Sequence, residues 1–183
     1  MDRQLVERAQ RGDRDAYEAL ARASASRLYR TARRIVRDAD GAEDAVQQTL
    51  VEMWRELPSL RDPDRFEAWT YRIVVRFCLE ESRRARRTGV REVHIQETEP
   101  ARADAIADSD LRDQLDRALR ELSREHRAVV VLHHYSGLSL GEIAEILGVP
   151  YGTVGSRLHH ATRALRASIA AGERSPLTGG QPA

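Results

Sequence analysis

Residues 138–154 read LSLGEIAEILGVPYGTV, and this stretch decides the fold class of the C-terminal part of the chain. Ser139 and Glu142 have the spacing of a capping box, which starts a helix. Gly148 suits the left-handed residue that ends a helix, and Pro150 suits the first turn of the next one. A short helix, a glycine turn and a second helix together predict a helix-turn-helix, a motif that places its second helix in the major groove of DNA.

The helix after Pro150 separates an apolar face from a polar one. At 100° per residue, Val154, Leu158, Ala161 and Leu165 form one stripe, which predicts the buried side. The side chains that we expect to face DNA are polar and weakly basic: Thr153, Ser156, Arg157, His159, His160 and Arg163. Such groups offer hydrogen bonds to base edges and phosphates. A helical hairpin whose polar face is merely solvated is the alternative.

The charge composition limits the kinds of partner. All 30 basic residues of the 183-residue chain are arginine, and 29 acidic residues leave a net charge of +1. A uniformly basic coat for nucleic acid is therefore excluded, and any basic surface is local. Arginine suits phosphate because its planar fork binds in a bidentate way. Codon bias in a GC-rich genome is the simpler explanation of the missing lysines.

Several other classes of protein are excluded by composition. No apolar run approaches the roughly 20 residues of a membrane span, and the N-terminus lacks the apolar segment of a signal peptide. We therefore expect a cytoplasmic protein without direct membrane insertion. Cys78 is the only cysteine, which excludes an internal disulfide and a cysteine-rich zinc site. Neighbouring His159 and His160 diverge by about 100° on a helix, so they are poor ligands for one metal ion.

Helical periodicity covers almost the whole chain and predicts an all-α protein made of two small helical domains. We expect the first domain at residues 1–87, a flexible acidic linker at 88–109, the helix-turn-helix domain at 110–171 and a disordered tail at 172–183. The one candidate strand lies at residues 90–95, inside the linker.

The expected helices have recognisable ends. The first long one follows Gly12, with a capping box at Asp15 and Glu18. Pro58 ends the second, which starts near Asp40. The remaining helices are expected at residues 66–84, 110–122 and 123–135, followed by two short helices on either side of Gly148.

Arginines form a seam along the helix expected at residues 66–84. Arg72, Arg76 and Arg83 lie within about 40° of one another in projection, and Arg65 joins them if the helix extends back to it. Such a seam can follow a nucleic-acid backbone. The aromatic side chains around it offer stacking surfaces for unpaired bases: Phe66, Trp69 and Tyr71. A solvated seam that pairs with Glu67 and Glu80 is the alternative.

The helix that starts near Asp40 has a polar face rich in acids and amides, including Asp44, Gln47 and Gln48. Its apolar stripe includes Met53 and Trp54. The polar face would repel DNA and suits a protein partner with basic or amide groups. A plain solvated face is the alternative.

Four motifs in this order resemble the extracytoplasmic-function (ECF, group IV) sigma factors of bacterial RNA polymerase. They are GDRDAYEAL at residues 12–20, DGAEDAVQQTLVEMW at 40–54, FEAWTYRI at 66–73 and GLSLGEIAEILGVPYGTVGSRL at 137–158. The resemblance covers roughly residues 7–170. It implies a region 2-like first domain, a region 4-like second domain, and the recognition of promoters with assistance to their melting.

The resemblance also implies partners. Asp44, Gln47 and Gln48 match the segment that docks on the β′ clamp of core RNA polymerase, whose β subunit is also contacted. The minus-ten promoter element would meet Arg65, Phe66, Trp69, Tyr71, Arg72, Arg76 and Arg83. The minus-thirty-five element would meet the helix-turn-helix residues named above. An anti-sigma factor is a further expected partner; no cofactor, metal or catalytic residue is implied.

The chain departs from the family pattern at four positions. Gln48 stands where Glu is usual, Arg76 where Asn is usual, and Gly155 and His160 where a basic residue is common. Gly155 removes a phosphate contact and costs the helix roughly 0.5–1 kcal/mol relative to Ala. We therefore expect the isolated second domain to bind DNA weakly, with attachment to the polymerase raising its effective concentration.

Two other functions are weighed against this one. A free-standing regulator would bind duplex DNA as a dimer, but the sequence has no obvious zipper or effector domain. A hydrolase or metal enzyme would have to use His94, His126, His133 and His134, whose spacing forms no compact acid, base or ligand set.

Overall fold

The computed structural model describes residues 2–87 and 106–173, and describes side chains only outside residues 81–113 and before residue 172. These ranges contain helices and no strand. The N-terminal unit comprises α1 (Arg3–Gln10), α2 (Arg14–Val36), α3 (Ala39–Glu56), the 3₁₀ turns η1 (Leu57–Ser59) and η2 (Pro63–Arg65), and α4 (Phe66–Arg87). The C-terminal unit comprises α5 (Ile106–Glu121), α6 (Arg124–Val130), the π-helical turn η3 (Val131–Tyr135), α7 (Leu140–Leu147) and α8 (Tyr151–Glu173).

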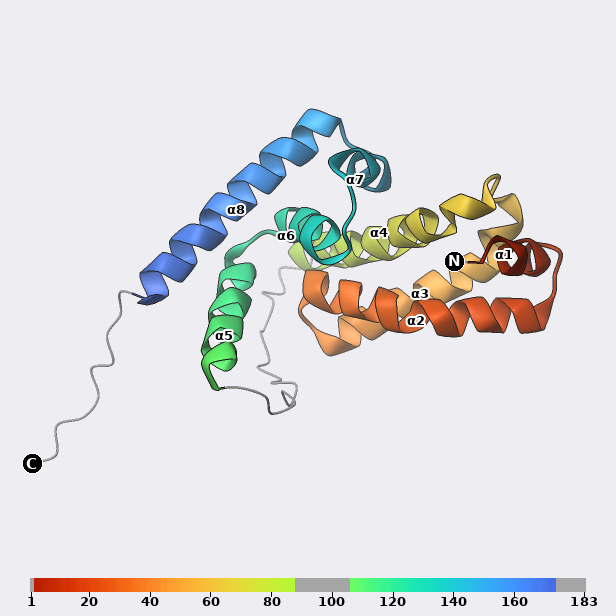
Figure 1. Cartoon of the computed structure of the whole chain (residues 1–183), viewed down its shortest axis with the longest axis horizontal. Helices are drawn as coiled ribbons and strands as arrows, with labels where there is room; N and C mark the ends of the chain where they lie inside the picture. Colours follow the sequence, from red (N-terminus) through yellow and green to blue (C-terminus); the bar gives the residue numbers. More distant parts are fainter. Residues whose placement is uncertain (1, 88–105, 174–183) are drawn as a thin grey trace, which may run out of the picture.

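Aspartates start the helices of the N-terminal unit. The side chain of Asp13 accepts a hydrogen bond from the amide of Ala16, and that of Asp38 accepts one from the amide of Gly41. Such caps satisfy amides that have no partner inside the helix. Helices α2, α3 and α4 pack against one another, with α1 across the end of α2 (Figure 1). The arrangement leaves one face of α3 and one face of α4 open to solvent.

The helix-turn-helix has the predicted ends. Ser139 and Glu142 form a complete capping box at the start of α7. Gly148 ends α7 in the left-handed conformation, with φ +62°, and α8 starts directly after Pro150. Val154 and Ala161 of α8 are buried, as the angular projection predicts.

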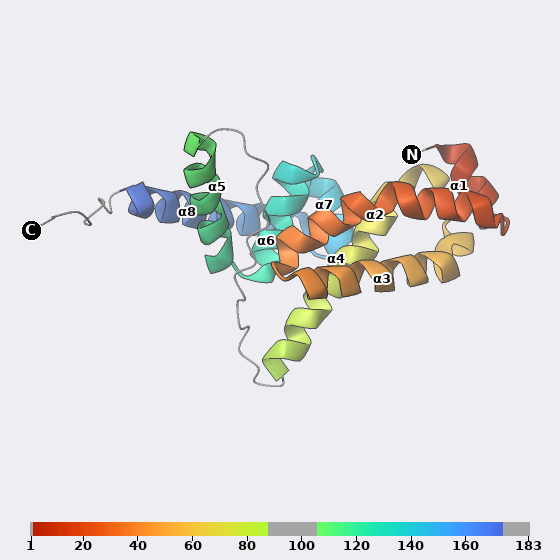
Figure 2. The ribbon, with the colours of Figure 1, turned by 90° about the horizontal axis from the view of Figure 1, so that it is seen from below.

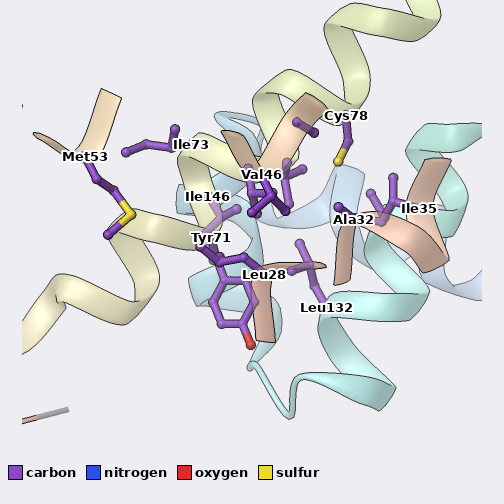
Figure 3. Close-up of a cluster of buried hydrophobic side chains, with 14 of the residues drawn as sticks. Leu28, Ala32, Ile35, Val46, Met53, Tyr71, Ile73, Cys78, Leu132 and Ile146 are labelled. Carbon is purple, nitrogen blue, oxygen red and sulfur yellow. The ribbon is translucent and has the colours of Figure 1, made fainter. Parts of the chain in front are cut away.

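The two units share one apolar core. Helix α6 and turn η3 lie between the N-terminal bundle and the α5–α8 pair in both views (Figures 1 and 2). The buried cluster combines Leu28 and Ile35 of α2 and Tyr71 of α4 with Leu132 of η3 and Ile146 of α7 (Figure 3). The chain therefore buries its two helical units against each other, an arrangement that the sequence does not predict.

The structure corrects several expected boundaries. Asp13, and not Asp15, caps the first long helix, so the capping box predicted at Asp15 and Glu18 is wrong. Helix α1 was not expected, although Asp2 caps it. Helix α8 is 23 residues long, and α5 starts at Ile106. The candidate strand at 90–95 and the tail at 174–183 lie outside the described residues. None of the described helices combines the length and the apolarity that crossing a membrane requires.

The capping box yields a stability prediction. Ser139→Ala removes the acceptor for the amide of Glu142 and a donor to its carboxylate, and should lower the free energy of unfolding by about 1 kcal/mol at pH 7. The hydrogen bonds from Ser139 lower the pKa of Glu142. A carboxyl group with a lowered pKa stabilises the fold above its unfolded pKa of about 4.3, and this contribution is lost as the pH falls through the folded-state pKa.

Urea unfolding of wild type and variant between pH 7 and pH 3 measures this effect. The difference in free energy of unfolding between wild type and Ser139→Ala should become smaller as the pH falls towards 3. Ser26→Ala, at an exposed position of α2, is the matched control and should change stability by less than about 0.5 kcal/mol. An equal decrease in the free energy of unfolding for Ser139→Ala and Ser26→Ala would contradict the assignment of Ser139 as the cap.

Candidate nucleic-acid interface

The arginines of α4 differ in how far they are already paired. Arg76 forms an ion pair with Glu52 of α3 and a second one, at 3.7 Å, with Glu80. Arg65, in turn η2, is paired with Glu145 of α7. Arg72 is exposed and has no ion pair with any other described side chain. Arg72 is therefore the most available cation of the seam, and the predicted alternative of pairing with acids applies to Arg76.

The aromatic rings around the seam are mostly buried. Phe66 is fully buried and Tyr71 is 5% exposed, so in this arrangement neither ring offers a face to an unpaired base. Both rings are covered because α4 packs against α2, α3 and α7 on more than one side. Trp69 is partly exposed and lies next to Phe66, with ring centroids 6.1 Å apart. Of these three rings, only that of Trp69 is partly open to solvent. The side chain of Arg83 lies outside the described residues.

Two hollows flank Trp69 and Arg72. One, of about 740 Å³, lies between α3 and α4 and is lined by Gln47, Gln48, Glu52, Arg72 and Arg76 among others. The other, of about 600 Å³, lies between the η1–η2 loop, α4 and α7. Arg61, Arg65 and Arg72 line this second hollow from the η1–η2 loop and α4. Glu142 and Glu145 line it from α7. Both hollows are large enough for a nucleotide base.

The polar face of α8 is open to solvent. Ser156, His159, His160 and Arg163 are exposed, whereas Thr153 and Arg157 are partly exposed. The hydroxyl of Ser156 donates to the carbonyl of Thr153, 3.0 Å away, so this hydroxyl is held along the helix and can accept a further bond. The structure therefore brings the predicted recognition residues together on one accessible surface.

A second accessible surface lies on α3. Asp44, Gln47 and Gln48 are exposed, as predicted. Val51, at 51% exposed, and Trp54, at 46% exposed, continue the same surface. Trp54 belongs to the apolar stripe predicted for this helix, but it is not buried: its ring rests edge-on against Tyr17, 4.8 Å between centroids, and its outer side meets solvent. The Tyr17 hydroxyl donates to the carbonyl of Leu50 and fixes this stack.

The next features of the described residues are their possible metal ligands and their one thiol. These residues contain no group of three or more His, Cys, Asp or Glu side chains suited to a metal ion. Burial raises the pKa of the Cys78 thiol to about 12, which keeps it protonated and unreactive. The surfaces on α3, α4 and α8 are thus suited to binding.

Helical units with a helix-turn-helix and an arginine-bearing helix are typical of proteins that bind DNA. Comparisons with known proteins are more specific. Residues 20–88 match sigma-70 region 2 and residues 112–165 match sigma-70 region 4. The ECF RNA polymerase sigma factor SigL of Mycobacterium tuberculosis is 38% identical over 148 residues, covering 78% of this chain and 82% of that protein.

Two solved structures have the same fold. The sigma factor RpoE from Bartonella quintana, in complex with the anti-sigma factor NepR, matches with TM-score 0.70 and 27% identity over 84% of this chain and 96% of that one. CnrH in complex with the cytosolic domain of CnrY matches with TM-score 0.65 and 28% identity over 93% and 97%. The chain belongs to the ECF family of RNA polymerase sigma factors.

Proposed function

We propose that the three surfaces divide the work of a sigma factor: α3 binds core RNA polymerase, α4 with the η1–η2 loop binds the minus-ten element, and α8 binds the minus-thirty-five element. The observation that carries this proposal is the separation of chemistries. The α3 surface is apolar and amide-rich, whereas the α4 and α8 surfaces carry exposed arginine and histidine. Phosphate needs cations, and a protein partner needs an apolar centre with polar surroundings.

The polymerase surface consists of Asp44, Gln47, Gln48, Val51 and Trp54. A half-exposed tryptophan held by a second ring has the properties of an interface hot spot, because its geometry is fixed before binding. The carboxylate and amides around it supply hydrogen bonds. The β′ clamp is the proposed partner of this surface.

The minus-ten surface consists of Arg65, Trp69, Arg72, Arg76 and the hollow between the η1–η2 loop, α4 and α7. Arg72 and Arg65 would bind phosphates of the unpaired strand, and Trp69 would stack on a base. Phe66 and Tyr71 are buried beneath this surface and would hold α4 in place. The minus-thirty-five surface is the exposed face of α8, whose hydroxyl and imidazole groups can bond to base edges in the major groove.

In this proposal the chemistry of RNA synthesis belongs to the polymerase, and the chain acts in the cytoplasm. Of the two structural neighbours, RpoE was solved with the anti-sigma factor NepR and CnrH with the cytosolic domain of CnrY. A protein of that kind is a proposed partner here. The free-standing regulator is not favoured, because regions 2 and 4 both match.

Reconstitution tests the proposal. The purified chain is mixed with sigma-free core polymerase and a promoter library, and transcript starts are mapped. Starts should depend on the chain and share two upstream elements. Sequence-specific binding by the chain alone, with no binding to core polymerase, would overturn the proposal.

The two arginines of α4 provide a matched pair of variants. Arg72→Ala should reduce the slope of log affinity against log salt by about 0.7, the value for one phosphate of a single strand, and should slow promoter opening. Arg76→Ala removes the same charge but breaks contacts to Glu52 and Glu80, so its slope should change less. Promoter affinities and opening rates, measured for the two variants across a salt series, test these expectations. Equal slopes for the two variants would contradict the assignment of Arg72.

The α3 surface is tested by affinity for core polymerase. Trp54→Ala should weaken binding by about tenfold or more, because fixed aromatic side chains dominate interfaces. Val51→Ser tests the same surface without disturbing the contact to Tyr17. Leu115→Ala, at a 42% exposed apolar position of α5, is the control and should leave the affinity unchanged. Normal binding by both α3 variants would place the polymerase contact elsewhere.

A further inference from the structure

We propose that helix α1 positions the η1–η2 loop, and that Gln10 of α1 is a positioning residue for base discrimination at the minus-ten element. The inference rests on the proposed function of this loop and of α4. Residues 20–88 match sigma-70 region 2, so α1, at Arg3–Gln10, precedes the matched residues. Helix α1 contacts the loop through hydrogen bonds, an ion pair and buried apolar side chains.

The side-chain amide of Gln10 bridges two carbonyls of the loop. Its Nε2 donates to the carbonyl of Leu57, 3.1 Å away, and to that of Leu60, 2.7 Å away. Leu57 begins the 3₁₀ turn η1, and Leu60 is the residue at which the chain leaves this turn. The carbonyl of Leu57 also accepts a hydrogen bond from the amide of Leu60, at 3.1 Å. One amide group of α1 therefore holds both ends of η1.

A second contact holds the far end of the loop. Arg3, at the start of α1, pairs with Asp64 of η2 at 2.6 Å. The side chain of Asp62 accepts a hydrogen bond from the amide of Asp64 and caps this turn, and Pro63 within it is buried. The two ends of α1 thus reach the two turns of the loop.

Helix α1 is itself fixed in place. Val6 is fully buried, in the same core cluster as Leu57 of the loop. Gly12 has φ +90°, a left-handed conformation that glycine adopts readily, and it turns the chain from α1 into α2. Arg8 pairs with Asp13 at 2.7 Å across this turn. Because α1 is fixed by its apolar face and at its end, it is a rigid support for the loop.

The loop forms one wall of the hollow in the minus-ten surface. Ser59, Arg61 and Asp62 line this hollow of about 600 Å³, and Gln10 is not among its lining residues. Hydroxyl, guanidinium and carboxylate groups discriminate among bases only when each is held at a fixed position. The main chain that carries these three groups is held by Gln10. This residue therefore acts on DNA through the loop.

Gln10→Met tests the inference, with Gln4→Met as the matched control. Methionine resembles glutamine in length but has no N–H donor, so the two loop carbonyls lose their partner. Gln4 is exposed on the same helix. Gln10→Lys is the rescue variant, because an ammonium group keeps a donor and a cation is favourable at the end of a helix. Each protein is assembled with core polymerase on a promoter found with wild type.

Transcription is measured from this promoter and from its single-base variants in each of the two elements. Gln10→Met should reduce the preference for the original minus-ten sequence by about tenfold, because two hydrogen bonds that hold the loop are lost. Its affinity for core polymerase and its preference at the minus-thirty-five element should not change. Gln4→Met should behave as wild type, and Gln10→Lys should keep most of the preference.

A merely structural role for Gln10 would lower transcription from all promoters alike and leave the minus-ten preference unchanged. That result would overturn the inference, as would an equal loss of preference in Gln10→Met and Gln10→Lys.

Hydrogen exchange of the free chain tests the support of the loop without DNA. The amides of Leu60 and Arg65 should exchange faster in Gln10→Met than in wild type, whereas exchange in α3 should stay the same. Unchanged exchange in the loop would also overturn the inference. Failure of wild type to direct transcription would instead contradict the proposed function.

Discussion

The contact on which the rest of the arrangement depends is the buried guanidinium of Arg127. Its three hydrogen bonds fix α6 against the ends of α2 and α5 at once. An arginine stays charged when buried, so it needs all of these acceptors. The position of α6 in turn determines where turn η3 lies and hence where α7 meets α4. The ion pair between Glu145 of α7 and Arg65 depends on this placement of α7.

Near-neutral overall charge is consistent with the way arginines are distributed. Arg76 and Arg65 are paired with acids, Arg127 is committed to carbonyls, and Arg72 is available to a ligand. A net charge of +1 therefore says little about the ability of the chain to bind DNA.

Local features of the fold could be predicted from the sequence, whereas contacts between distant segments could not. The capping box at Ser139, the left-handed Gly148 and the buried stripe of α8 follow from spacing alone. Projection shows which residues share a helix face, but it does not show what covers that face. For this reason Phe66 and Tyr71 were expected to be accessible and Trp54 to be buried, and the opposite is observed. Packing between the units depends on contacts such as Arg127 with Ile35, 92 residues apart, which leave no periodic signal.

The distance between the units is the most direct test of this account. Spin labels at Arg30→Cys, towards the end of α2, and at Arg117→Cys, on α5 next to the ion pair of Arg37 with Asp116, report it by pulsed electron resonance, first in the free chain and then in its complex with core polymerase and promoter DNA. The account predicts one short distance in the free chain and a distance longer by tens of ångströms in the complex, as the roughly 85 Å between the promoter elements requires. The same short distance in both states would contradict it.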